Sequence, residues 1–159
     1  MSKKSELEYV TETYVRGRYE GTKMNNMRHG KGVFYYNEGG KYIGEWKENK
    51  MYGKGVLYYP NNEIAYDGEW RNDQLEGRGT LYNEEVQLLS GQYDYKDWDE
   101  VEDYWIKYEG AFSEDSKNGE GKLYLSNGEI FEGHFREDMV WGDGVLNRRD
   151  GTKIKGSWR

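Results

Sequence analysis

The glycines of this chain recur at a nearly constant spacing, and that spacing limits the folds open to it. Each leading glycine comes 19 to 24 residues after the one before it, and in five units a Gly-x-Gly follows nine residues later. The leading glycines are Gly21, Gly44, Gly68, Gly91, Gly110, Gly133 and Gly156. A fixed period of this length is typical of a repeat protein, in which each unit packs only against its neighbours.

Within a unit the pattern has a period of two. Tyr42, Gly44 and Trp46 alternate with residues of another kind, and such alternation is typical of a β-strand. A tight turn is predicted five residues after the leading glycine, at Asn26, Asn49, Asp73, Asp115 and Asp138, because Asn and Asp tolerate left-handed backbone. A second turn signal stands at Gly39, Asn62, Gly128 and Gly151. Each unit is therefore predicted to be a β-hairpin.

Hairpins of this kind are expected to associate side by side, because an isolated hairpin is only marginally stable in water. We predict an all-β fold, an elongated single-layer antiparallel sheet of about six to seven sequential hairpins over residues 19–159. Residues 1–18 are expected to be an N-terminal extension, ordered in part, in which Tyr9, Val10, Tyr14 and Val15 are candidates for a leading strand. Glycines beside large rings are expected to let the sheet curve around an aromatic groove.

Two stretches carry the pattern most completely. They run from Tyr42-Ile43-Gly44-Glu45-Trp46 through Gly53-Lys54-Gly55-Val56-Leu57, and from Tyr66-Asp67-Gly68-Glu69-Trp70 through Gly77-Arg78-Gly79-Thr80-Leu81. Both resemble the MORN repeat (membrane occupation and recognition nexus), and the resemblance extends over residues 19–159. It implies a β-hairpin solenoid and a role as a scaffold or partner-binding surface, without implying one particular activity.

The pattern weakens at two places. Lys23 stands where an aromatic residue belongs, which is consistent with an atypical end repeat. The unit at about residues 89–107 lacks its Gly-x-Gly and has five carboxylates between Asp97 and Asp103. A degenerate hairpin with an acidic, aromatic tip and a contact site for a basic partner both remain open. A calcium loop is disfavoured, because Glu102 and Tyr108 occupy the positions that need Gly and Glu.

Composition argues against chemistry and against nucleic acid. The net charge is −7, with 30 acidic and 23 basic residues, which disfavours a nucleic-acid partner. The absence of cysteine excludes a thiol nucleophile or a cysteine-based metal site. The only histidines, His29 and His134, lie in different repeats and cannot form a metal pair. We therefore expect no enzyme activity, no cofactor and no metal.

The groove aromatics are the predicted partner-binding residues, and those of the middle repeats are expected to stay partly exposed. They are Tyr42, Trp46, Tyr66, Trp70, Tyr108, Phe112, Phe131 and Phe135. Secondary contacts are expected at Trp98, Trp105, Arg148 and Arg149. A second row, Tyr35, Tyr58, Tyr82 and Tyr124, either packs across strands or forms another binding face.

These features predict a scaffold or adaptor that binds segments of one or more proteins within a larger complex. The family resemblance implies a cytoplasmic, cytoskeleton-associated location, including the cilium or flagellum. The alternative is a peripheral membrane adaptor whose basic C-terminal strip contacts anionic lipid. That strip consists of Arg148, Arg149, Lys153, Lys155 and Arg159.

Overall fold

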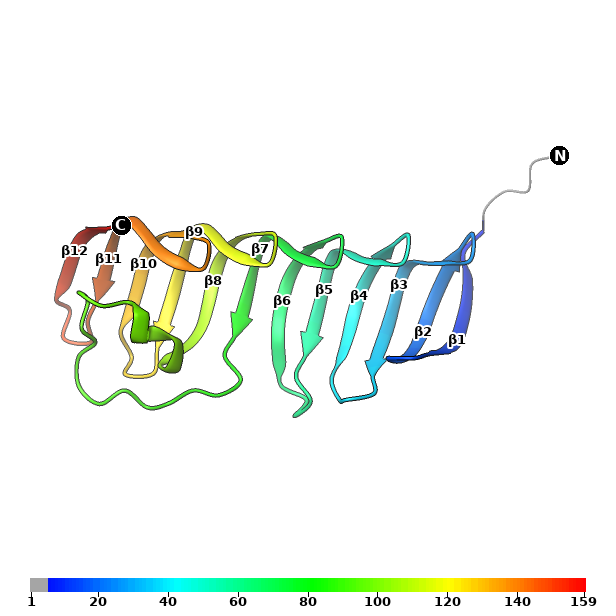
Figure 1. Ribbon diagram of the computed structural model, residues 1–159, viewed down its shortest axis with the longest axis horizontal. Coiled ribbons are helices and arrows are strands. Elements are labelled where there is room, and N and C mark those ends of the chain that lie inside the picture. The colour runs from blue at the N-terminus through cyan, green and yellow to red at the C-terminus, as the bar shows by residue number, and fades with distance from the viewer. Residues whose placement is uncertain (1–5) are drawn as a thin grey trace. The chain divides into compact units, whose positions relative to one another are not determined.

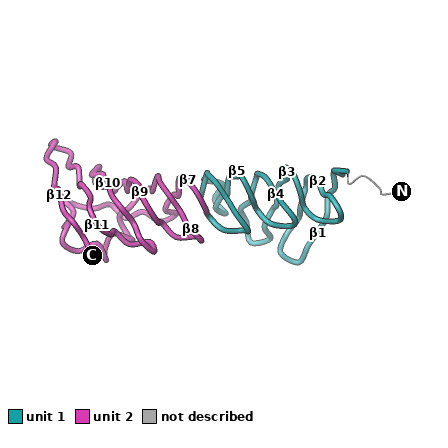
Figure 2. The backbone as a smooth tube through the Cα atoms, turned by 90° about the horizontal axis from the view of Figure 1, so that it is seen from above, with its two compact units in different colours: residues 1–75 teal, residues 76–159 magenta. Residues whose placement is uncertain are grey.

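The computed structural model describes residues 6–159, and its regular structure is almost entirely β. The first five residues of the expected N-terminal extension lie outside the described part. The chain divides into two compact units, residues 1–75 and residues 76–159 (Figure 2). Within each unit every strand pairs antiparallel with strands next to it in the chain (Figure 1). The predicted fold class, sequential antiparallel hairpins, is confirmed.

The first unit contains the strands β1 to β6. Their bounds are β1 Glu8–Tyr14, β2 Gly17–Met24, β3 Met27–Tyr36, β4 Lys41–Lys47, β5 Lys50–Tyr58 and β6 Ile64–Arg71. Each pairs with the next, from β1 with β2 to β5 with β6. The leading strand expected before the first repeat is present as β1, which holds Tyr9, Val10 and Tyr14, whereas Val15 lies in the turn after it.

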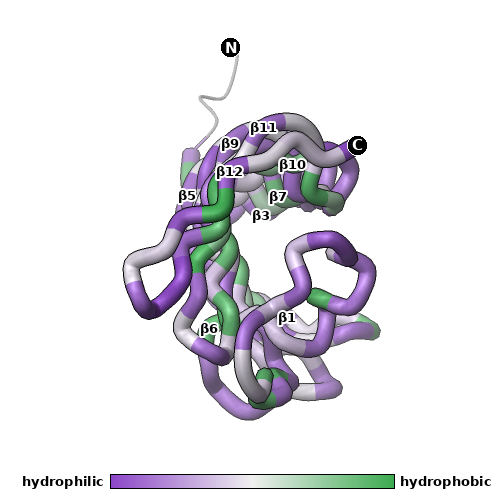
Figure 3. The backbone as a smooth tube through the Cα atoms, turned by 90° about the vertical axis from the view of Figure 1, so that its left-hand side faces the viewer, coloured by the Kyte–Doolittle hydropathy of each residue, from purple (hydrophilic) through white to green (hydrophobic). Residues whose placement is uncertain are grey.

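The second unit contains the strands that follow. Their bounds are β7 Gln74–Tyr82, whose first two residues belong to the first unit, β8 Trp105–Ser113, β9 Ser116–Leu125, β10 Ile130–Arg136, β11 Met139–Asn147 and β12 Lys153–Trp158. The pairing again runs in chain order, from β7 with β8 to β11 with β12. Hydrophilic and hydrophobic segments are interspersed along the backbone in Figure 3.

The hairpin turns form where the Asn and Asp residues predicted them. Both central residues of each turn have positive φ, between 48° and 71°, as a two-residue hairpin turn of the type I′ kind requires. The pairs are Asn25–Asn26, Glu48–Asn49, Asn72–Asp73, Glu114–Asp115 and Glu137–Asp138. The second turn signal is also confirmed, because Gly39, Asn62, Gly128 and Gly151 all have positive φ.

The two glycines of a Gly-x-Gly serve different physical purposes. Gly53 has a φ of 68° beside an irregularity in the β4–β5 register, a backbone conformation that glycine adopts without strain. At Gly55 the reason is steric. A Cβ built there would lie 2.2 Å from the Tyr42 hydroxyl oxygen, and Gly55 also faces Gly44 across the strands. The ring of Tyr42 therefore lies directly over bare backbone.

The hairpin expected at about residues 89–107 is not formed. Residues 83–104, which we call the insert, contain no strand and one 3-10 helix, η1, Asp99–Asp103. The next strand, β8, pairs directly with β7. The insert is thus a lengthened form of the connection that elsewhere takes four or five residues, as at 126–129 and 148–152. Without a Gly-x-Gly to admit a ring, this stretch cannot form the bent strand that the pattern needs.

Candidate functional site

The eight predicted partner-binding rings are all buried. Tyr42, Tyr66, Tyr108 and Phe131 are 0% exposed, and the other four, Trp46, Trp70, Phe112 and Phe135, are at most 5% exposed. The expectation that the middle rings stay partly exposed is wrong. It assumed that one layer of strands leaves one side of each ring open, whereas in the structure the rings cover one another.

Packing in the first unit explains this burial. The Tyr42 ring lies edge-to-face between Trp46 and Trp70, with ring centroids 5.2 and 5.3 Å apart. Each indole also donates a hydrogen bond to a glycine carbonyl, as Trp70 Nε1 does to Gly55 at 3.0 Å. Burial raises the pKa of the Tyr42 hydroxyl, which donates to the Glu45 carbonyl at 2.8 Å. The rings form a continuous apolar core with every polar edge satisfied.

The second unit repeats this arrangement. The Tyr108 ring lies between Phe112 and Phe135 at 5.1 and 4.9 Å, and the Phe131 ring lies 5.7 Å from Phe135 and 5.4 Å from Trp158. Edge-to-face contacts of this kind are favourable beyond the area they bury. Each unit therefore has an aromatic face built in the same way.

At the first repeat a cation replaces the missing ring. Lys23 is 8% exposed, and its Nζ donates to Glu12 of β1 at 2.8 Å. That hydrogen bond raises the pKa of Lys23 and lowers that of Glu12. The atypical end repeat predicted from Lys23 is thus closed by an ion pair from the leading strand.

The insert lies against the aromatic face of the second unit (Figure 1). The Trp98 ring packs on Phe131 at 4.8 Å and on Trp158 at 5.9 Å, and Tyr93 packs on Trp98 at 4.9 Å. Tyr93 is 4% exposed, and burial is the main reason that its pKa is raised. Part of the chain itself therefore occupies the face that sequence analysis assigned to a partner.

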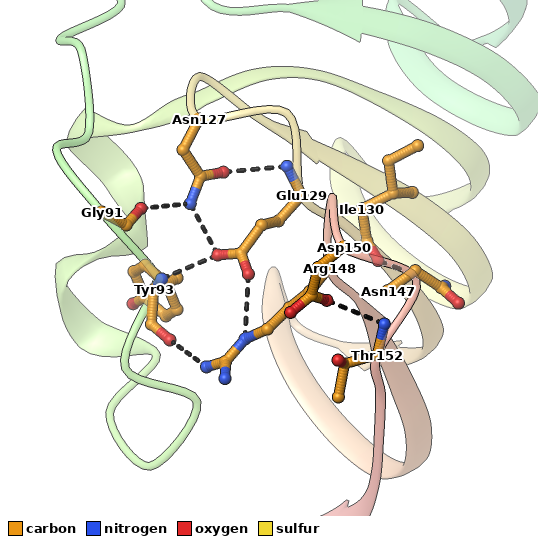
Figure 4. Close-up of polar contacts among 9 residues, drawn as sticks. All are labelled: Gly91, Tyr93, Asn127, Glu129, Ile130, Asn147, Arg148, Asp150 and Thr152. Atoms are coloured by element: carbon orange, nitrogen blue, oxygen red, sulfur yellow. Dashed lines mark hydrogen bonds and ion pairs between the residues drawn. The ribbon is translucent and has the colours of Figure 1, made fainter.

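A buried ion pair holds the insert in place (Figure 4). Arg148 Nε donates to Glu129 at 3.0 Å, and the two side chains are 15% and 3% exposed. Glu129 also accepts the Tyr93 backbone N–H at 2.7 Å, and the Arg148 guanidinium donates to the Tyr93 carbonyl at 3.1 Å. Asn127 Nδ2 donates both to Glu129 and to the Gly91 carbonyl, at 2.6 and 2.9 Å. We call Asn127, Glu129 and Arg148 the clasp.

The structure places the predicted secondary contacts differently. Trp98 lies inside the second unit and Trp105 is 7% exposed beneath Lys117, whose Nζ is 5.0 Å from the indole centroid. Arg148 belongs to the clasp, and only Arg149 is exposed. Glu129 was missed by sequence analysis. Its one signal there was an Asn-Gly-Glu turn, which does not reveal burial.

The tyrosine row on the other side of the strands makes cross-strand contacts with cations. The Arg18 guanidinium lies 4.7 Å from the Tyr35 ring centroid, and Lys41 Nζ lies 4.9 Å from that of Tyr58. In the second unit Lys107 Nζ lies 4.6 Å from the Tyr124 ring. Each of these cations is the register partner of its tyrosine. Cross-strand packing, one of the two interpretations left open by the sequence, therefore accounts for these three tyrosines.

The described residues contain neither a metal-binding cluster nor a membrane-spanning helix. In residues 6–159 no group of three or more His, Asp or Glu side chains is arranged to hold a metal ion. The same residues contain no helix with the length and apolar character needed to cross a membrane.

Comparison with known proteins agrees with the repeat pattern. The family model of the MORN repeat matches residues 19–41, 42–64, 66–83 and 108–130, which together make up more than half of the chain. The interval between the last two matches contains most of the insert. A comparison with curated proteins found no match.

Proposed function

Because this chain belongs to the MORN-repeat family, we propose that it is a non-catalytic scaffold that binds extended segments of partner proteins along its aromatic face. MORN repeats are a non-catalytic repeat type that generally mediates protein or membrane interactions. For this chain we propose protein binding rather than membrane binding, through the aromatic face.

One observation carries it. In the second unit an irregular segment lies on the aromatic face, with the Trp98 ring 4.8 Å from Phe131, one of the eight predicted binding residues. A face that accepts such a segment from its own chain has the shape and chemistry to accept one from a partner. We propose that the eight buried rings support this face rigidly. Because they are packed against one another, they fix the position in which an aromatic side chain of a partner can lie.

The proposal includes a location. We place the protein in the cytoplasm, in a complex with one or more proteins of a cytoskeletal assembly, with the cilium or flagellum included. The family resemblance supports this placement. The net charge of −7 favours protein over nucleic-acid partners.

The membrane alternative has less support from the structure. Arg148, the first residue of the basic strip, pairs with Glu129 and with the Tyr93 carbonyl, so its charge faces the protein interior. Lys153 and Lys155 remain exposed on β12. Vesicle flotation with and without anionic lipid tests this alternative, and loss of flotation in a Lys153→Glu/Lys155→Glu variant would support it.

Affinity capture of the tagged full-length chain, with chemical cross-linking and mass spectrometry, tests the scaffold. Trp70→Ala or Phe112→Ala is expected to weaken capture, because each of these buried rings fixes the surface on which a partner segment would dock. Tyr52→Ala is the matched control. Its ring is 40% exposed, and because Met51 beside it on β5 faces inward, Tyr52 points away from the aromatic face. Cytoskeletal partners cross-linked to the aromatic face are expected. Equal capture by all variants, together with lipid binding through the basic strip, would contradict the proposal.

A further inference from the structure

The clasp recognises backbone atoms of the insert more than its side chains. The Tyr93 N–H and carbonyl and the Gly91 carbonyl bind the clasp (Figure 4). Beyond it, the Leu89 N–H donates to Ser126 Oγ at 2.9 Å, and Trp158 Nε1 donates to the Tyr95 carbonyl at 2.8 Å. Backbone hydrogen bonds give affinity for an extended peptide whatever its sequence, while side-chain pockets give specificity.

Two rings of the insert provide that specificity. Tyr93 is 4% exposed beside the clasp, and Trp98, five residues later, packs on Phe131 and Trp158. Carboxylates flank the tryptophan. Asp97 and Asp99 line a surface depression that they share with Arg136 and Arg159. The site thus selects a Tyr-x4-Trp spacing with acidic residues next to the tryptophan.

The insert does not fill its site completely. A cavity of about 240 Å³ lies between it and the strands, with Trp98 and Val101 on one side and Leu123, Phe135 and Val140 on the other. The indole Nε1–H of Trp98 is buried and has no hydrogen-bond acceptor. This pocket is partly open to solvent and is also lined by Lys117 and Asp138, so the unsatisfied donor is the feature that weakens binding. A ligand that fills this pocket more fully, and that carries no unsatisfied donor into the site, would bind more tightly than the insert does.

The strand ladder does not need the insert. The Asn83 N–H donates to the Ile106 carbonyl at 2.9 Å, and the Leu125 N–H donates to the Glu129 carbonyl at the same distance. These two bonds close equivalent connections. Only Ser126, Asn127 and Gly128 stand between Leu125 and Glu129. Between Asn83 and Ile106, by contrast, stand residues 84–105.

We propose that the clasp and the adjoining aromatic face of β10 and β12 are a binding site for an extended acidic peptide of a partner protein with a Tyr-x4-Trp spacing, and that the insert occupies this site as an internal competitor. This inference rests on the proposed scaffold function and names the partner chemistry for one of its surfaces. Since a tethered segment acts at millimolar effective concentration, the partner binds only when it displaces the insert.

A synthetic, fluorescently labelled peptide with the sequence of residues 87–100 serves as the probe. Its binding is measured by anisotropy to the full chain and to a variant in which Ser-Asn-Gly replaces residues 84–105, which removes most of the insert and also Trp105, the first residue of β8. The variant is expected to bind at least tenfold more tightly, because its site is open. In the variant background, Arg148→Ala and a probe carrying Trp98→Ala should each reduce affinity at least tenfold. Glu63→Gln, at the turn position of the first unit that matches Glu129, should change nothing.

Hydrogen exchange shows whether β8 to β12 of the variant remain folded. If these strands do not remain folded, the binding experiment uses the full chain carrying Tyr93→Ala and Trp98→Ala instead of the shortened variant, since these substitutions loosen the insert without shortening the chain. A folded variant that binds the probe no better than the full chain overturns the inference, as does binding that Arg148→Ala leaves unchanged. Neither result bears on the scaffold function, because partner capture by the full chain is a separate measurement.

Discussion

Gly55→Ala tests the account of the aromatic core most directly. An added Cβ would lie 2.2 Å from the Tyr42 hydroxyl oxygen and 2.4 Å from two ring carbons, far inside contact distance. The ring cannot move aside, because Trp46 and Trp70 lie on either side at 5.2 and 5.3 Å. Either the ring or the strand must shift, and the hydrogen bond from Tyr42 to the Glu45 carbonyl is then lost.

The effects can be compared in magnitude. Overpacking in a tight core destabilises by about 1–3 kcal/mol, and a lost hydrogen bond adds about 1 kcal/mol. Replacing glycine by alanine restricts the unfolded chain and returns roughly 0.4–1 kcal/mol, because the φ of Gly55 is not positive. The net expectation is a loss of about 2 kcal/mol, a factor of roughly thirty in the local opening equilibrium.

Hydrogen exchange with mass spectrometry measures this loss segment by segment. We expect faster exchange in β4, β5 and β6 and unchanged exchange in β9 to β12, because repeat stability depends on nearest neighbours.

Tyr42→Leu provides the matched control. It shortens the side chain that the new methyl would meet, so Gly55→Ala should cost much less in that background, with the difference measured as a double-mutant cycle. Tolerance of Gly55→Ala alone, or an equal loss in both backgrounds, would refute the steric explanation. A uniform loss of protection over residues 6–159 would refute the nearest-neighbour one.

Two further predictions follow from the polar and phenolic groups. Glu129→Gln should release the insert, because it leaves the Arg148 charge unpaired, and the loss of one partner of such an ion pair destabilises by about 3–5 kcal/mol. Hydrogen exchange at residues 87–98 should become faster, and unchanged exchange there would contradict the prediction. Glu63→Gln serves as the exposed control. Burial raises the pKa of Tyr19 and Tyr108 to about 12, so the folded chain holds protons that the unfolded chain releases near pH 10. Stability should therefore fall as pH rises from about 10 to 12, and a free energy of unfolding that stays constant over this range would contradict the prediction.

Much of the fold follows from the sequence because its determinants are local. The turn at Glu48–Asn49 forms where Asn49 stands, because asparagine tolerates positive φ. The turn and the period of two would pair Gly44 with Gly53, and the register irregularity between Gly44 and Trp46 shifts this pairing to Gly55. The same reasoning applies in every repeat, so the glycine spacing alone predicts sequential antiparallel hairpins. Lys23 was likewise recognisable as the mark of an end repeat.

The candidate site follows from the sequence only in part. Within each unit the ring positions were identified correctly as one face, yet their exposure was not, because burial depends on how rings of successive repeats pack. Tyr42 is covered by Trp70, a residue 28 positions further along the chain. A pattern gives the spacing of such residues and says nothing of the distance between their rings.

What the sequence by itself determined is the repeat, its strands and turns, and the family to which the chain belongs. What only the tertiary structure decided is the position of residues 83–104 and the role of the clasp. Tyr93 meets Glu129 at a separation of 36 residues and Arg148 at a separation of 55. Contacts over such distances leave no periodicity in the sequence. The insert therefore resembled a damaged repeat, whereas the folded chain uses it to cover the aromatic face of its second unit.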